Sequence, residues 1–156
     1  METNEKVIDV LNDLIRINND RIDGYQKAAE EIKDTADAEI KGVFITMAEQ
    51  SRNNASELRS AVIDLAGEPA QDTTASGKIY RVWMDVKATF SGDDTTAALK
   101  SCEFGEDAAL KAYKDAQKAE VAWPTGVAAT IEEQREGLQR SHDTIKRLRD
   151  MYVAAH

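Results

Sequence analysis

The sequence predicts an all-α fold, an antiparallel four-helix bundle that forms a single domain over residues 1–156. Three observations predict it. Apolar residues recur at steps of three and four along four long stretches, which is the period of an amphipathic helix. Glycine, proline or small polar residues separate these stretches, and no stretch alternates apolar and polar residues as a half-buried strand does. Because most of the links are short, an antiparallel bundle is the simplest packing of four such helices.

The composition argues against several classes of function. The chain carries 20 basic and 29 acidic residues, a formal net charge of −9 at pH 7, whereas nucleic-acid-binding proteins usually present a basic face. An anionic membrane surface is disfavoured for the same reason, and no apolar run approaches the ~20 residues that span a bilayer. The N-terminus lacks the pattern of an export signal, and the single cysteine, Cys102, fits a reducing compartment. We therefore expect a cytoplasmic protein.

The first two helices are expected from Asn4 to Asp34 and from Ala36 to Ala66. Gly67, Glu68 and Pro69 follow the second and form a typical C-terminal stop. Each helix has one inward stripe, interrupted near its middle by polar residues. The first stripe is Val7, Leu11, Leu14, Asn18, Ile22, Tyr25, Ala29 and Ile32, and the second is Ile40, Phe44, Met47, Ser51, Asn54, Leu58, Val62 and Leu65.

A long crossover follows the second helix. Residues 70–76 are small and polar, and a short amphipathic helix is expected after them, with Ile79, Val82, Trp83, Val86 and Phe90 on one face. We expect Tyr80, Trp83 and Phe90 either to cover the end of the bundle or to form an apolar patch for a homodimer. Asp93 or Asp94 then caps the next helix. Ferritin-like bundles contain a long crossover of this kind.

The last two long helices are expected from Thr95 to Glu120 and from Pro124 to Ala154. Each long helix contains an internal glycine, which indicates either close helix packing or an exposed neutral position. These glycines are Gly24, Gly42, Gly105 and Gly137. The third inward stripe is Leu99, Cys102, Glu106, Ala109 and Tyr113, and the fourth is Val127, Ile131, Arg135, Leu138, His142, Ile145, Leu148 and Tyr152.

Polar residues interrupt all four stripes at about the same depth, so a buried polar layer across the apolar core is predicted. Its members are Asn18, Ser51, Asn54, Glu106, Gln139 and His142. Unpaired polar groups would be costly to bury, so these groups are expected to bond one another, water or a metal ion. Glu106 and His142 are the natural pair, because a carboxylate balances the charge of an imidazolium.

A metal site is the alternative reading of this layer. A di-iron carboxylate centre takes a glutamate from each of two helices and Glu-x-x-His from each of the other two. The corresponding positions hold Asn18, Ser51-x-x-Asn54, Glu103-x-x-Glu106 and Gln139-x-x-His142. Too few ligands are therefore present for two metals, and we expect no cofactor. One weakly held iron, manganese or zinc ion on Glu103, Glu106 and His142, as in a degenerate di-metal oxidase site, remains the alternative.

Three segments resemble an uncharacterised bacterial family of ferritin-like four-helix proteins, a domain of unknown function, and the likeness extends over nearly the whole chain. They are Leu11-Asn12-Asp13-Leu14, residues 47–52 and residues 141–150. Gly105-Glu106 followed by Tyr113 is distantly similar to the rubrerythrins. The resemblance implies a ferritin-like fold and a link to stress responses, but no established activity. We therefore expect a non-enzymatic, stress-associated protein, with an unknown protein partner as a further class.

Overall fold

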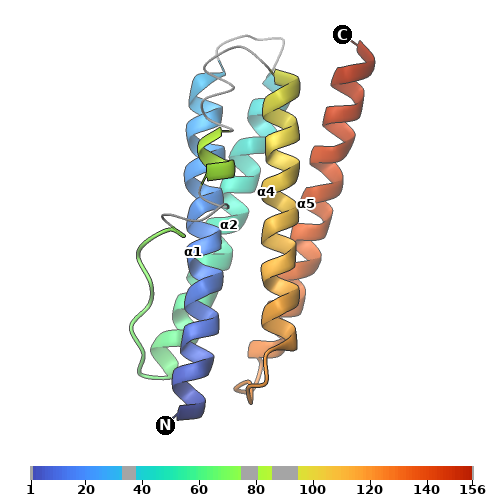
Figure 1. The fold of residues 1–156 in the computed structure, drawn as a ribbon. Coiled ribbons are helices and arrows are strands. Elements are labelled where there is room, and N and C mark those ends of the chain that lie inside the picture. The colour runs from blue at the N-terminus through green and yellow to red at the C-terminus, as the bar shows by residue number, and fades with distance from the viewer. Residues whose placement is uncertain (1, 33–37, 75–80, 86–94, 156) are drawn as a thin grey trace.

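The structure, a computed structural model, describes residues 2–32, 38–74, 81–85 and 95–155. Within these ranges the chain is helical and contains no strand, which confirms the all-α prediction. Four long helices, α1 (Glu2–Glu31), α2 (Ala38–Asp64), α4 (Thr95–Lys118) and α5 (Val127–Ala155), lie side by side (Figure 1). A four-helix bundle fits this arrangement. No helix in the described ranges is long and apolar enough to cross a bilayer.

Each helix has two neighbours. The most extensive contacts join α1 to α2 and α4 to α5, whereas α1 with α4 and α2 with α5 make the smaller contacts. Figure 1 shows the first residues of α1 and the last residues of α5 at opposite ends of the molecule. The interior of the bundle is therefore lined by all four helices, and four seams between neighbouring helices separate it from solvent.

The ends of the helices differ by a few residues from the sequence expectation. The predicted stop after α2 falls earlier, because Ala66 adopts a left-handed φ of 61° and the amide of Gly67 donates to the carbonyl of Val62 at 3.0 Å, as in a Schellman motif. Gly67 has a packing role instead, since a Cβ there would lie 2.7 Å from Ile8 of α1. The last helix begins at Val127, not at Pro124.

The apolar core consists of two clusters along the bundle. One is built around Tyr25, Phe44 and Leu99, and the other around Leu11, Leu58 and Leu138. Polar side chains that are at least nine-tenths buried interrupt the core of the long helices. They are Asn18, Asp20 and Arg21 from α1, Ser51 and Asn54 from α2, Thr95 and Glu106 from α4, and Gln134 and Ser141 from α5.

The crossover packs along α1. Asn12 accepts a hydrogen bond from the amide of Ala70 at 2.8 Å, and Arg16 forms a 2.9 Å ion pair with Asp72. The helical segment 81–85 then lies against the upper halves of α1 and α4 (Figure 1). The residues expected at 79, 80, 86, 90, 93 and 94 lie outside the described ranges. Trp83 is only 3% exposed, so the expectation that it contributes to a dimer patch was wrong.

Candidate functional site: a buried charge centre

A fully buried ion pair joins α1 to α4 in the middle of the bundle. The Nη2 and Nε atoms of Arg21 donate to Oε1 of Glu106 at 2.8 and 3.2 Å, and neither side chain is exposed. The hydroxyl of Tyr25, one turn along α1, donates to the same carboxylate oxygen. Taking two charges out of water is costly, and only close pairing with further hydrogen bonds offsets that cost.

The other face of the Arg21 guanidinium is bonded to α2. Its Nη1 donates to the hydroxyl of Ser51 and to Oε1 of Gln50 at 3.1 Å, and Gln50 also accepts from Ser141 of α5 at 3.0 Å. Arg21 thereby connects α1, α2 and α4 directly, and α5 through Gln50. Burial is the largest single influence on Arg21 and opposes its charge, but the combined effects of Glu106, Tyr25 and Tyr113 outweigh burial and hold the pKa of Arg21 above its ordinary value.

A chain of neutral groups continues the layer below the ion pair. The side-chain amide of Asn18 donates to the hydroxyl of Tyr113 at 2.9 Å, and Tyr113 donates to Gln134 at 2.7 Å. Asn54 donates to Asn18 at 3.3 Å, and Gln134 donates to the backbone carbonyl of Asn54 at 3.3 Å. Burial raises the pKa of both Tyr25 and Tyr113, so each phenol stays protonated and acts as a donor at neutral pH.

The structure brings together four of the six residues predicted for the polar layer. Asn18, Ser51, Asn54 and Glu106 are buried and belong to the network just described.

The other two, His142 and Gln139, do not join the layer. His142 pairs with Asp107 at 2.8 Å and with Asp143 at 3.4 Å on the half-buried side of α5, and Gln139 donates to Asp143 at 3.1 Å. The expected Glu106–His142 pair was therefore wrong. The inward face of α5 passes through Gln134 and Ser141 instead, each one residue before the positions expected.

The predicted metal ligands do not converge either. Glu103 forms an ion pair with Arg149 of α5, Glu106 is bonded to Arg21, and His142 faces Asp107. In the described part of the chain no group of three His, Cys, Asp or Glu side chains is arranged to hold a metal ion. The remaining oxygen of Glu106, Oε2, is buried without a hydrogen-bond partner among the described residues.

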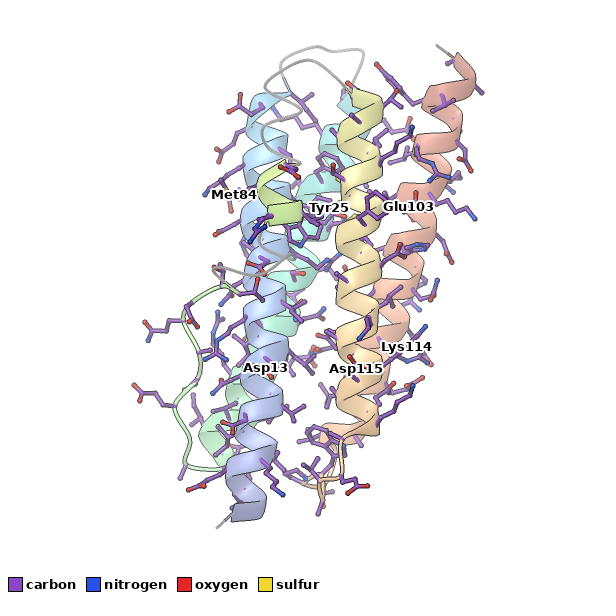
Figure 2. The ribbon with its side chains drawn as sticks, viewed as in Figure 1. Asp13, Tyr25, Met84, Glu103, Lys114 and Asp115 are labelled. Carbon is purple, nitrogen blue, oxygen red and sulfur yellow. The ribbon has the colours of Figure 1, made fainter. Side chains whose placement is uncertain are left out.

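Trp83 seals the charge centre on the seam between α1 and α4. A Cβ at Gly24 of α1 or at Gly105 of α4 would lie 2.5 Å from its indole ring, so both helices need a glycine where the ring enters. The indole meets the Tyr25 ring edge-on, with centroids 4.8 Å apart. Figure 2 shows Tyr25 beside the short segment that carries Met84. The close-packing explanation of the internal glycines thus holds for these two, whereas a Cβ at Gly42 would meet nothing.

Sequence reasoning missed six members of the network, which are Arg21, Tyr25, Gln50, Tyr113, Gln134 and Ser141. One signal was present. A glutamate on an inward stripe requires a cation, and Arg21 lies one helical turn before Tyr25 and one residue from Ile22, which was assigned to the stripe. Ile22 is in fact only half-buried. A charge-balance criterion would have favoured Arg21 over the more apolar neighbour.

The comparisons with known proteins assign the chain to an uncharacterised family. No curated protein matches the sequence. The model of one family, described as a domain of unknown function (DUF2383), matches residues 6–119. The matched part includes α2, α4 and all but the first residues of α1, and hence Arg21, Tyr25, Ser51 and Glu106. The chain belongs to this family, the DUF2383 domain of unknown function.

Proposed function

We propose that this protein is a non-enzymatic antiparallel bundle of ferritin-like connectivity, in which the Arg21–Glu106 pair takes the central level that a metal centre occupies in a di-iron bundle. The antiparallel order is supported by the partners of α1, because Asn18 bonds Tyr113 whereas Arg21, further along α1, bonds the earlier residue Glu106. Between α2 and α5 the order is likewise reversed, since Gln50 bonds Ser141 and Asn54 bonds Gln134. The crossover between α2 and α4 supports the ferritin-like connectivity.

The residues do not fit the di-metal centre that such a fold implies. Several carboxylates and two histidines are needed, but the only buried carboxylates of the described helices are Glu106 and Asp20, and Asp20 is bonded to Thr74 of the crossover. The partner of Glu106 is an arginine, whose guanidinium has no lone pair to offer a metal and stays charged at any physiological pH. The buried guanidinium is the single observation that carries this proposal, because it already supplies the positive charge that Glu106 requires.

The pair then serves to select one arrangement of the helices. The Arg21–Glu106 pair forms only when α1, α2 and α4 are in this register, and a shift by one residue would leave two buried charges unpaired. Buried polar groups have this role in some helical assemblies, where they set register at some cost in stability. A non-enzymatic bundle of fixed geometry is a scaffold on which a binding surface can be presented.

Metal uptake tests the proposal. The protein is incubated separately with Fe²⁺, Mn²⁺ or Zn²⁺, desalted, and examined by elemental analysis and thermal unfolding. We expect far less than one ion per chain and an unchanged Tm, because Arg21 occupies the carboxylate. Near-stoichiometric metal that is lost in Glu106→Gln but kept in the surface variant Glu5→Gln would overturn the proposal.

Three further expectations remain proposals. A cytoplasmic location is supported by Cys102, which is buried and forms no disulfide. Homodimer formation is proposed without Trp83 as a contact, because that side chain is buried. Light scattering on the purified protein measures the oligomeric state directly. A link to stress responses rests on the family resemblance alone, and a transcript that does not change under oxidative, osmotic and heat stress would contradict it.

A further inference from the structure

Tyr25 is a buried phenol that has a base on one side and an aromatic ring on the other. Its side chain is fully buried, and its hydroxyl donates to Oε1 of Glu106. Its ring meets the indole of Trp83 edge-on, with the two centroids 4.8 Å apart. A buried phenol gives up an electron readily only if its proton can leave as well, because a neutral phenoxyl radical costs less to bury than a charged one. The surroundings of Tyr25 supply an acceptor for the proton and a neighbour for the electron.

Glu106 is suited to receive that proton. Its Oε1 accepts from Arg21 and Tyr25, whereas its Oε2 is buried without a hydrogen-bond partner among the described residues. An unpaired buried oxygen costs more in a charged carboxylate than in a neutral carboxylic acid, so protonation of Glu106 relieves part of this cost.

The charge of Arg21 acts on both ends of the proton transfer. It favours the carboxylate form of Glu106 and so opposes protonation there. It also opposes a positive charge on the Tyr25 ring, because the guanidinium carbon lies 5.5 Å from the ring centroid. An oxidised Tyr25 beside Arg21 is therefore driven to lose its proton, and Glu106 is the group to which the phenol is already bonded.

The second buried phenol of the polar layer, that of Tyr113, lacks such a base. Its hydroxyl donates to the side-chain carbonyl of Gln134 at 2.7 Å, and an amide oxygen is a far weaker base than a carboxylate. The two tyrosines are both buried, but they differ in the property that oxidation in an apolar interior requires. Tyr113 is therefore a matched control for Tyr25.

Trp83 provides a route for the electron. It belongs to the segment 81–85, which lies against the upper halves of α1 and α4 (Figure 1). Its indole fills the α1/α4 seam between Gly24 and Gly105 and contacts Tyr25 from there. An oxidant that cannot enter the bundle can take an electron from the indole, and the ring contact allows an electron from Tyr25 to follow.

We propose that Tyr25 is a one-electron donor that quenches oxidising radicals outside the protein. The oxidising radical takes one electron from Trp83 and is reduced by it. Trp83 then takes an electron from Tyr25, whose phenolic O–H bond breaks as the proton forms an O–H bond with Oε1 of Glu106. The net change turns Tyr25 into a neutral phenoxyl radical and Glu106 into a carboxylic acid, while Trp83 returns to its starting state.

Pulse radiolysis in azide solution tests the proposal on the full chain, because azide radicals oxidise indoles faster than phenols. We expect an indolyl radical first, and then its replacement by a tyrosyl radical at a rate that does not depend on protein concentration. Tyr25→Phe should abolish this step, whereas Tyr113→Phe should keep it. Trp83→Phe should likewise abolish it, whereas Trp123→Phe should keep it. Circular dichroism checks that each variant is folded.

The role of Glu106 has its own test, because Glu106→Gln alone leaves Arg21 without a counter-ion. The double variant Arg21→Met/Glu106→Leu keeps Tyr25 but removes the base, and it should lose the step from indolyl to tyrosyl radical. In the wild type, after equilibration in D2O, this step should be slower than in water, since the proton moves with the electron. This second measurement needs no variant.

Three outcomes would overturn the proposal. One is a tyrosyl radical that forms in Tyr25→Phe as it does in the wild type, because another tyrosine would then be the donor. Another is an indolyl radical of the wild type that never passes to a tyrosine. The third is an equal rate in water and D2O, which would mean that no proton moves to Glu106 in this step.

Discussion

The α1/α4 seam and the α2/α5 seam border the same polar layer, but the first is closed over buried charges and the second is open over neutral groups. On the α1/α4 side, Glu106 and Arg21 are entirely buried, and the indole of Trp83 fills the gap between Gly24 and Gly105. On the α2/α5 side, the layer ends in neutral amide and hydroxyl groups that line cavities along that seam, those of Gln50, Asn54, Gln134 and Ser141. The charges thus lie where water is excluded and a counter-ion is at hand, and neutral groups lie where water has access.

This difference indicates that the seal and the ion pair depend on each other. Without Trp83, Glu106 would gain water and lose much of its attraction to Arg21, since that attraction weakens as the local dielectric constant rises. Without Arg21, the seal would trap an unpaired carboxylate. The neutral end of the layer has no such dependence, so its seam can remain open.

The largest expected effect is the loss of Arg21. Arg21→Met leaves Glu106 buried without a cation, and breaking a buried pair from one side costs about 3–5 kcal/mol. The double variant Arg21→Met/Glu106→Leu removes both charges and should recover most of that loss. Urea unfolding followed by circular dichroism measures both. The exposed pair on the outer face of α4 is the control, and Lys111→Met should cost less than about 0.5 kcal/mol there.

Two outcomes would contradict the special role given to the buried Arg21–Glu106 pair. If Arg21→Met costs no more than Lys111→Met, the buried pair contributes nothing that a surface pair does not. If the double variant is no more stable than the single variant, the loss arises from packing and not from the unpaired charge. The double variant also keeps the test valid should Arg21→Met fail to fold.

A smaller effect is expected from the glycine that admits Trp83. Gly105→Ala places a methyl group against the indole, and overpacking of this kind costs about 1–3 kcal/mol. The control is Gly42→Ala in α2, where a Cβ meets nothing and the change should stabilise the helix by up to about 1 kcal/mol. In a Trp123→Phe background, the emission of Trp83 should shift to the red only in Gly105→Ala. Equal stabilities of the two alanine variants would show that the seal is loose.

The helices could be predicted from the sequence because many residues contribute to the periodic pattern of each one. The stripes through Leu11, Phe44 and Leu138 are so long that one wrongly assigned residue does not change the period. The core of the site could not be predicted in the same way. Ile22 and Arg21 both fit the α1 stripe, and only the position of Glu106, 85 residues away in sequence, decides between them. The same ambiguity between neighbouring positions led to His142 in place of Ser141.

The smallest expected effect concerns Asp20, a carboxylate that faces the crossover and forms no ion pair with any described residue. It is 1% exposed and accepts hydrogen bonds from the amide of Thr74, at 3.3 Å, and from its hydroxyl. Burial, with a small contribution from Asp23 and against the opposing effect of Thr74, raises the pKa of Asp20 from 3.8 to about 6. Glu106, by contrast, has Arg21 as its counter-ion.

Because its pKa is raised on folding, Asp20 favours the folded state most when it is protonated, below pH 3.8, and this contribution is lost as the pH rises through about 6. Asp20→Asn does not titrate. Its stability relative to the wild type should therefore increase between pH 4 and pH 6 and level off above, by on the order of 1 kcal/mol after allowance for solvent screening. Urea unfolding across this range measures the difference, with Asp13→Asn as the exposed control. A constant difference would mean that water reaches Asp20, and that the α1 side is less well sealed near the crossover than it is beneath Trp83.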